Sequence, residues 1–256
     1  MLARMITLAF EGALAICTLS RAPVNAIDEE WLARLDEALA ALERAPQAGV
    51  LLVRSTERAF CAGADLALMR SRMDSAGDRA RFVAFVRDIQ RVFARLERLS
   101  QVTLAEIGAS ALGGGLELAL SCDLRIASGD ARLGLPETGL GLLPGAGGTQ
   151  RLTRIAGEAS AKRLILRAEV VRGAEAAALG IVHWAVPAEE LRERARTIAC
   201  ELAALAAPAL AEAKRCIAAA IPREAPGYEM ELKATAALLE QPATRSRVQA
   251  FLEKRR

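Results

Sequence analysis

Short apolar segments that resemble β-strands alternate with amphipathic, helix-like segments from Ile6 to about Pro187. This alternation restricts the possible folds more than any other feature, because strands separated by helices favour an α/β architecture. After Pro187 the chain is rich in alanine and almost entirely helix-like. We therefore predict an α/β core over residues 1–190, which contains any active site, and a helical region over residues 191–256.

Turn and capping signals divide this pattern into individual elements. Glu11-Gly12 separates the first two strand-like runs and predicts a hairpin. Asp28 precedes two acidic residues and an apolar repeat at helical spacing, so we expect it to cap a helix. The same signals predict strands over 6–10, 13–19, 50–53, 103–107 and 124–127, an amphipathic stretch over 69–99, a helix over 116–122, a loop over 133–148 and a helix after it.

The composition argues against several classes of site. A single histidine, His183, and the lack of CxxC spacing argue against a zinc site, and we expect His183 to be structural. The net charge of +3 is too small to indicate nucleic-acid binding by itself. No apolar run reaches about twenty residues, and Met1 to Met5 lack a signal-peptide pattern, so we expect a cytoplasmic protein. In that compartment we expect buried, reduced thiols at Cys17, Cys61, Cys122, Cys200 and Cys216.

Three consecutive glycines, Gly113 to Gly115, stand where a strand enters a helix. Glycine lets a ligand approach the backbone, and the start of a helix presents unpaired N–H groups with partial positive charge. Such a site suits a phosphate or a developing oxyanion. The glycines are followed by neither Lys-Ser/Thr nor GxGxxG spacing, which favours the oxyanion. A tight turn with close helix packing would explain them equally well.

Two carboxylates stand out in apolar surroundings. Glu117 lies in the first turn of the predicted helix, and Glu137 is the only ionisable group between Arg132 and Arg151. Alone, Glu117 could stabilise the helix dipole and Glu137 could be an ordinary loop acid. Together, beside exposed backbone donors, they suit placing a water molecule and moving a proton. A loop of small residues over 60–66 would expose further backbone N–H groups.

Taken in order, FCAGADL (60–66), ALGGGLELALSCD (111–123) and LGLPETGLGLLPGAGGTQRL (133–152) resemble the enoyl-CoA hydratase/isomerase (crotonase) family. The resemblance extends over nearly the whole chain. It implies a spiral of ββα turns with a C-terminal helical region that builds trimers, often paired into hexamers. It also implies an enzyme of fatty-acid β-oxidation that acts on acyl-CoA thioesters. Coenzyme A is then part of the substrate, and neither a separate cofactor nor a metal is expected.

The resemblance also implies roles for individual residues. The backbone N–H groups of Ala64 and Gly114 would form an oxyanion hole for the thioester carbonyl. Glu117 would act as base toward water, Glu137 would protonate the α-carbon, and the N–H of Gly145 would help to hold the water. The product of a trans-2-enoyl-CoA would be a 3-hydroxyacyl-CoA. The residues expected to line the CoA and acyl path are Ala62, Gly63, Ala64, Asp65, Leu66, Ala67, Gly113 and Gly114.

Several positions depart from the family pattern. Gly108-Ala109 replace an Asn, Asp or His followed by Gly, Ala67 replaces a frequent lysine, and Ser246-Arg247 replace Glu-Gly. Glu106 stands where a small apolar residue is usual. A buried Glu needs a partner or a raised pKa. We therefore expect Glu106 to line a site, pair with an arginine or face a subunit interface.

Other functions remain open alongside the general hydratase. The motifs also resemble 3-methylglutaconyl-CoA hydratase, and the family includes isomerases. An idle assembly subunit would not need both Glu117 and Glu137. RNA binding, attributed in a relative to a lysine-rich first helix, is disfavoured because residues 28–44 are net acidic and repel phosphate.

Overall fold

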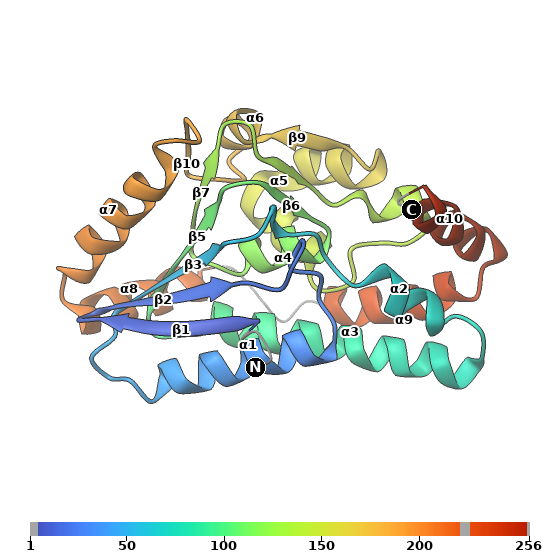
Figure 1. Cartoon of the computed structure of the whole chain (residues 1–256), viewed down its shortest axis with the longest axis horizontal. Helices are drawn as coiled ribbons and strands as arrows, with labels where there is room; N and C mark the ends of the chain where they lie inside the picture. Colours follow the sequence, from blue (N-terminus) through green and yellow to red (C-terminus); the bar gives the residue numbers. More distant parts are fainter. Residues whose placement is uncertain (1–4, 221–225, 255–256) are drawn as a thin grey trace.

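The computed structural model describes residues 5–220 and 226–254, and it places two β-sheets in the α/β core (Figure 1). Residues 1–4, 221–225 and 255–256, which fall within the regions predicted above, lie outside these ranges. The first sheet has six strands; β1 and β2 form the predicted antiparallel hairpin, and all other neighbours are parallel. In spatial order its strands are β1 (Ile6–Glu11), β2 (Leu14–Leu19), β3 (Val50–Ser55), β5 (Val102–Ile107), β7 (Leu124–Ser128) and β10 (Trp184–Val186).

The second sheet has four short strands, in the order β4 (Ala59–Cys61), β6 (Ser110–Leu112), β8 (Arg132–Gly134) and β9 (Val170–Arg172). Strands β4, β6 and β8 are parallel, and β9 is antiparallel to β8. Each of β3, β5 and β7 belongs to the first sheet and is followed directly by a strand of the second sheet and then by a helix. This repetition is the predicted spiral of ββα turns, which is confirmed.

Helices cover the six-stranded sheet on both faces, so its strands are buried on both sides, as is usual for parallel sheets. On β2, Ala15 and Cys17 belong to the main hydrophobic core. Leu14 and Ile16 point to the other face of the sheet and belong to a second hydrophobic cluster, which α7 (Leu191–Ala203) completes. The carboxylate of Asp28 accepts a hydrogen bond from Trp31 N–H at 2.8 Å, which confirms the predicted N-cap. The helix that Asp28 caps is α1 (Glu29–Glu43).

Three predicted boundaries in the core are corrected. The amphipathic stretch over 69–99 is two helices, because Ser75 accepts a hydrogen bond from Asp78 N–H and starts a new helix. The helix predicted from Leu116 already begins at Gly114, and the loop over 133–148 contains both a strand and a 3-10 helix. The remaining core elements are α2 (Leu66–Ser71), α3 (Ala76–Glu97), α4 (Gly114–Leu120), η1 (Pro136–Leu140), α5 (Gly148–Leu166) and α6 (Gly173–Ala178).

The described C-terminal part is helical, as predicted, but its helices go to two different ends of the molecule (Figure 1). Helices α7 and α8 pack beside the six-stranded sheet, whereas α9 contacts α3, and α10 contacts α2. No helix in the two described ranges is long and apolar enough to cross a membrane. The last three helices are α8 (Ala207–Ala219), α9 (Gly227–Leu239) and α10 (Pro242–Glu253).

The prediction of buried thiols is correct for three cysteines and wrong for two. All five are free, and Cys17, Cys61 and Cys122 are buried, but Cys200 and Cys216 are exposed. Cys200 lies on α7 beside the helix face that packs against the sheet, and Cys216 lies on α8, which has no buried residue. Alanine-rich helices that cover a sheet with one face only leave the opposite face to solvent.

Candidate active site

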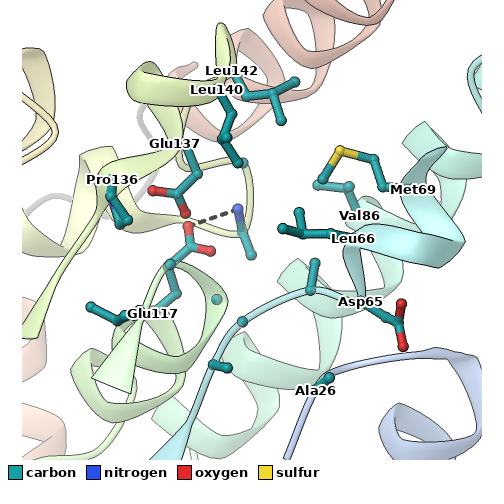
Figure 2. A pocket seen from close by; sticks show the side chains of 18 of the residues that line it. Ala26, Asp65, Leu66, Met69, Val86, Glu117, Pro136, Glu137, Leu140 and Leu142 are labelled. Atoms are coloured by element: carbon teal, nitrogen blue, oxygen red, sulfur yellow. Dashed lines mark hydrogen bonds between the residues drawn. The ribbon is translucent and has the colours of Figure 1, made fainter. Parts of the chain in front are cut away.

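A cavity of about 560 Å³ lies where the spiral core meets the C-terminal helices, and its wall is predominantly apolar. All residues expected to line the CoA and acyl path are on this wall. So are the two candidate acids, Glu117 and Glu137, and the candidate water-positioning residue Gly145. The structure therefore brings every predicted site residue into one cavity (Figure 2).

The predicted oxyanion donors come from two adjacent segments, the loop after β4 and the first residue of α4. The nitrogen of Ala64 lies 3.4 Å from the point that a Cβ atom on Gly114 would occupy. Within the described residues, neither of these N–H groups donates a hydrogen bond. The segments can approach because Gly115 has no side chain: a Cβ there would lie 2.0 Å from the carbonyl oxygen of Cys61. The cavity thus presents two neighbouring, unoccupied backbone donors.

Asp65, by contrast, directs its carboxylate away from the acid pair (Figure 2). Its Oδ1 accepts hydrogen bonds from the N–H groups of Ala67 and Leu68 at 2.9 and 3.1 Å, so it caps α2. Its place in the cavity wall therefore reflects the backbone of this loop, and its side chain stabilises the helix that follows.

Glu117 lies in the first turn of α4 and is only 2% exposed. Its Oε1 accepts hydrogen bonds from the N–H groups of Ala146 and Gly148, at 2.8 and 2.7 Å. Gly148 is the first residue of α5, so these donors belong to the start of that helix, where N–H groups lack helical partners. The N-terminus of α5 therefore holds this carboxylate in place.

Glu137 approaches from the opposite wall, on η1, and its carboxylate faces that of Glu117 (Figure 2). Its Oε2 is buried and has no hydrogen-bond partner among the described residues. Glu117 and Glu137 therefore differ in their surroundings, because one carboxylate receives two backbone donors and the other retains a free acceptor.

Burial raises the pKa of Glu137 to about 7. Burial also raises the pKa of Glu117 well above its usual value, and the charges of Glu137 and Glu231 raise it further, while the N–H of Gly148 and the Arg151 guanidinium oppose the shift. Two facing carboxyls titrate as a coupled pair. Such a pair can hold one proton near neutral pH, which is the state needed for an acid and a base to act together.

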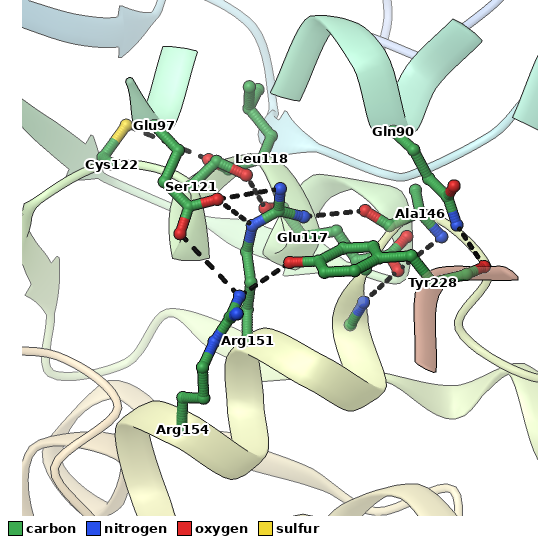
Figure 3. A network of polar contacts seen from close by, with 12 residues as sticks. Gln90, Glu97, Glu117, Leu118, Ser121, Cys122, Ala146, Arg151, Arg154 and Tyr228 are labelled. Carbon is green, nitrogen blue, oxygen red and sulfur yellow. Dashed lines mark hydrogen bonds and ion pairs between the residues drawn. The ribbon is translucent and has the colours of Figure 1, made fainter. Parts of the chain in front are cut away.

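The sequence prediction missed the residues that hold the loop directly before α5 from behind. Arg151, which is 1% exposed, donates from Nη1 to the carbonyl of Ala146 at 2.8 Å and lies over the ring of Tyr228 (Figure 3). Glu231 of α9 is another buried carboxylate, and it accepts a hydrogen bond from the N–H of Gly147 in the same loop. Helix α9 also carries the exposed Glu229, and no local pattern indicates which acid faces inward. The apolar residues of the cavity wall were also missed, because no local pattern distinguishes them from ordinary core residues. They include Phe82, Val86, Ile89, Leu142, Phe251 and Leu252.

Two further sequence candidates lie outside the cavity wall. Glu106 on β5 is 5% exposed, and the Nε of Arg192 is 3.9 Å from its Oε1; of the three expected environments, the structure shows the pairing with an arginine. Burial raises the pKa of Glu106. His183 accepts a hydrogen bond from Arg125 N–H at 3.2 Å directly before β10, which fits its expected structural role. In the described ranges, no group of three or more His, Cys, Asp or Glu could hold a metal ion.

Comparisons with known proteins show which family this chain resembles. The family model described as enoyl-CoA hydratase/isomerase matches residues 9–256. The Bacillus subtilis protein YngF is 40% identical over 246 residues, which cover 95% of this chain and 93% of YngF. A short-chain-enoyl-CoA hydratase of Clostridium acetobutylicum is 37% identical and covers 81% of this chain and 78% of its own length.

Among solved structures, an enoyl-CoA hydratase of Bacillus anthracis aligns with a TM-score of 0.79 at 33% identity, over 98% of this chain and 96% of that chain. Pseudomonas aeruginosa DspI aligns with a TM-score of 0.80 at 35% identity, over 90% and 92% of the two chains. The similarity to these proteins, in sequence and in fold, therefore extends over almost the full length of the chain. The chain belongs to the enoyl-CoA hydratase/isomerase family, also called the crotonase family.

Proposed function

We propose that this protein is an enoyl-CoA hydratase, a hydro-lyase that adds water to a trans-2-enoyl-CoA and yields a 3-hydroxyacyl-CoA. One observation carries the proposal: the carboxylates of buried Glu117 and half-buried Glu137 face each other (Figure 2), in the same cavity as the N–H groups of Ala64 and Gly114, which donate no hydrogen bond within the described residues. The short-chain-enoyl-CoA hydratase from Clostridium, at 37% identity, supports the same reaction class.

The thioester carbonyl would accept hydrogen bonds from Ala64 and Gly114, which stabilise the enolate oxygen without reorganisation. Water would lie between the two carboxylates, with the N–H of Gly145 as a further donor. The two backbone donors favour the charged form of Glu117, which takes a proton from water as the oxygen bonds to C3. Glu137 gives its proton to C2. Transfer of one proton between the facing carboxyls then restores the starting state.

The cavity wall supports an uncharged acyl group. In the described ranges its wall contains no Lys, Arg or His, and the ionisable side chains directed into it are Glu117 and Glu137. A second carboxylate on the substrate, as in 3-methylglutaconyl-CoA, would be repelled by such a wall and would need a cation to offset its desolvation. We therefore place simple enoyl-CoA thioesters ahead of dicarboxylic ones. The facing acids Glu117 and Glu137 also favour hydration over isomerisation, since addition of water needs a base that deprotonates the water and an acid that protonates C2.

The remaining sequence predictions become part of this proposal. We propose a cytoplasmic enzyme of fatty-acid β-oxidation without a separate cofactor, assembled as a trimer or a hexamer. We keep the division into a core over 1–190 and a helical region over 191–256 that serves oligomerisation. Large apolar side chains are exposed on the single chain, which supports subunit contacts; the most exposed of them in the described ranges are Leu166, Leu205, Ile217 and Met230.

A spectrophotometric assay tests the function directly. Crotonyl-CoA, longer trans-2-enoyl-CoAs and 3-methylglutaconyl-CoA would each be supplied to the full-length protein, and loss of the conjugated-thioester absorbance would be followed. We expect turnover of the simple enoyl-CoAs and slower turnover of the dicarboxylic one. Unchanged absorbance with every substrate would refute hydration and favour an idle assembly subunit. Faster turnover of 3-methylglutaconyl-CoA would overturn the argument from the acidic wall.

A further inference from the structure

Four consecutive N–H groups, from Ala146 to Thr149, are divided between two buried carboxylates. Those of Ala146 and Gly148 donate to Glu117, as described above. The N–H of Gly147 donates to Oε2 of Glu231 at 2.7 Å, and the N–H of Thr149 donates to its Oε1 at 3.2 Å. The first turn of α5 and the residues before it are therefore held alternately from two sides.

Glu231 is built into this position and does not touch the cavity. It is 4% exposed, on α9, and is not part of the cavity wall. The Thr149 hydroxyl donates to its Oε1 at 2.5 Å, and the side-chain amide of Gln90 donates to its Oε2 at 3.2 Å. The same amide donates to the carbonyl of Gly145 at 2.7 Å. A buried carboxylate with four donors is costly to move, because any displaced donor would be left unsatisfied.

We propose that Glu231 is a positioning residue of the hydration site, which holds the start of α5 so that Ala146 and Gly148 donate to Glu117 and Gly145 faces the water. This inference rests on the proposed hydratase function. Glu231 accepts hydrogen bonds from the N–H groups of Gly147 and Thr149. The N–H groups left to point toward the cavity are therefore those of Ala146 and Gly148, which donate to Glu117. Gly147 permits the alternation, because its φ of 99° lies in a region that other residues rarely adopt.

The charge of Glu231 has a second effect on the acid pair. It raises the pKa of both Glu117 and Glu137, since like charges in a dry site disfavour one another. The groups facing Glu231 are Gln90 from α3, Thr149 and Arg151 from α5, and the two acids across the loop. Only Arg151 among them is a cation, so removing the charge of Glu231 should lower the pKa of the pair.

The test compares full-length wild-type protein, Glu231→Gln and a matched control, Glu229→Gln, on crotonyl-CoA. Glu229 lies on the same helix with a side chain 62% exposed, and its Oε2 is 3.6 Å from Nη2 of the exposed Arg87. For Glu231→Gln we expect kcat to fall about 10- to 100-fold with little change in KM, because the residue does not touch substrate. Both limbs of the pH profile of kcat/KM should move about half to one unit lower. Glu229→Gln should match wild type in both respects.

Wild-type kcat and an unmoved pH profile for Glu231→Gln would overturn the inference. A fall in kcat without a shift in either limb of the pH profile of kcat/KM would also overturn the inference, because a purely structural role predicts that result. If Glu231→Gln does not fold, Thr149→Val decides: it removes one donor to Glu231, and an unchanged kcat in that variant would refute the positioning role. An inactive wild-type protein would instead refute the hydratase function itself.

Discussion

Replacing Gly115 by alanine would separate the two halves of the proposed oxyanion site, the N–H groups of Ala64 and Gly114. A Cβ atom there would lie 2.0 Å from the carbonyl oxygen of Cys61 and 2.6 Å from its carbonyl carbon. Real Cβ contacts stay at 3.0 Å or more, so α4 and β4 must move apart by about 1 Å. Neither partner is a flexible side chain, so the shift passes to the segments that carry the N–H groups of Ala64 and Gly114.

The size of the effect follows from this displacement. A misplacement of about 1 Å at a reacting centre costs about 100-fold in rate, so kcat on crotonyl-CoA should fall by about that factor. Overpacking of a core costs about 1–3 kcal/mol, and a protein of this size loses about 2–4 °C in Tm for each kcal/mol. Kinetics with crotonyl-CoA and thermal unfolding followed by circular dichroism measure the two effects.

Gly77→Ala is the matched control for this substitution. Gly77 lies in the first turn of α3, and the nearest atom to a Cβ there is the Ser75 hydroxyl oxygen at 3.8 Å. It should retain wild-type kcat, and its stability should stay level or rise by up to about 1 kcal/mol, because alanine favours helix. The steric argument is refuted if Gly115→Ala keeps both the kcat and the Tm of wild type.

Three further substitutions test the remaining elements. Glu117→Gln should lower kcat by about three orders of magnitude with Tm nearly unchanged, since its amide oxygen can still accept the two N–H bonds; near-normal turnover would exclude it as the base. Burial raises the pKa of Glu137 to about 7, above its unfolded value, so its ionisation destabilises the fold as pH rises through that value. Glu137→Gln should therefore stabilise the protein by up to about 3 kcal/mol at pH 8 but not at pH 4, as urea unfolding at both pH values would show. Asp28→Ala should cost about 1 kcal/mol in the same measurement through loss of the α1 cap, and no loss would contradict that role.

The fold could be predicted from the sequence where elements are long enough to show a period. The first hairpin, the Asp28 cap and strands such as Val50–Ser55 follow from alternation, capping and apolar runs. The second sheet was not predicted, because its strands span only three residues each and a period of two cannot be recognised over that length. Its existence came only from the family resemblance.

The site was predicted unevenly for a similar reason. Glu117 and Glu137 stand out because their sequence neighbours are apolar and glycine-rich, so local context was sufficient. Glu231 has no such context; it reaches the site through the packing of α9 on α3 and α5, which tertiary contacts alone reveal. Arg151 was likewise hidden, because a helical arginine is ordinarily solvated, whereas this one is 1% exposed.

The position of α5 explains how two buried carboxylates, Glu117 and Glu231, can lie so close to each other and to the half-buried Glu137. An ionised carboxylate taken out of water is costly unless donors and opposite charge compensate for it. Here the N–H groups around the start of α5 supply two donors to Glu117 and two to Glu231, at the end of a helix that carries partial positive charge. Arg151, one turn further along α5, adds a full positive charge that opposes the raised pKa of both. Glu137 lacks these donors. In the proposed reaction, the same helix end would favour the charged form of Glu117 against the burial and neighbouring charges that raise its pKa, and would leave Glu137 to hold the proton that addition of water requires.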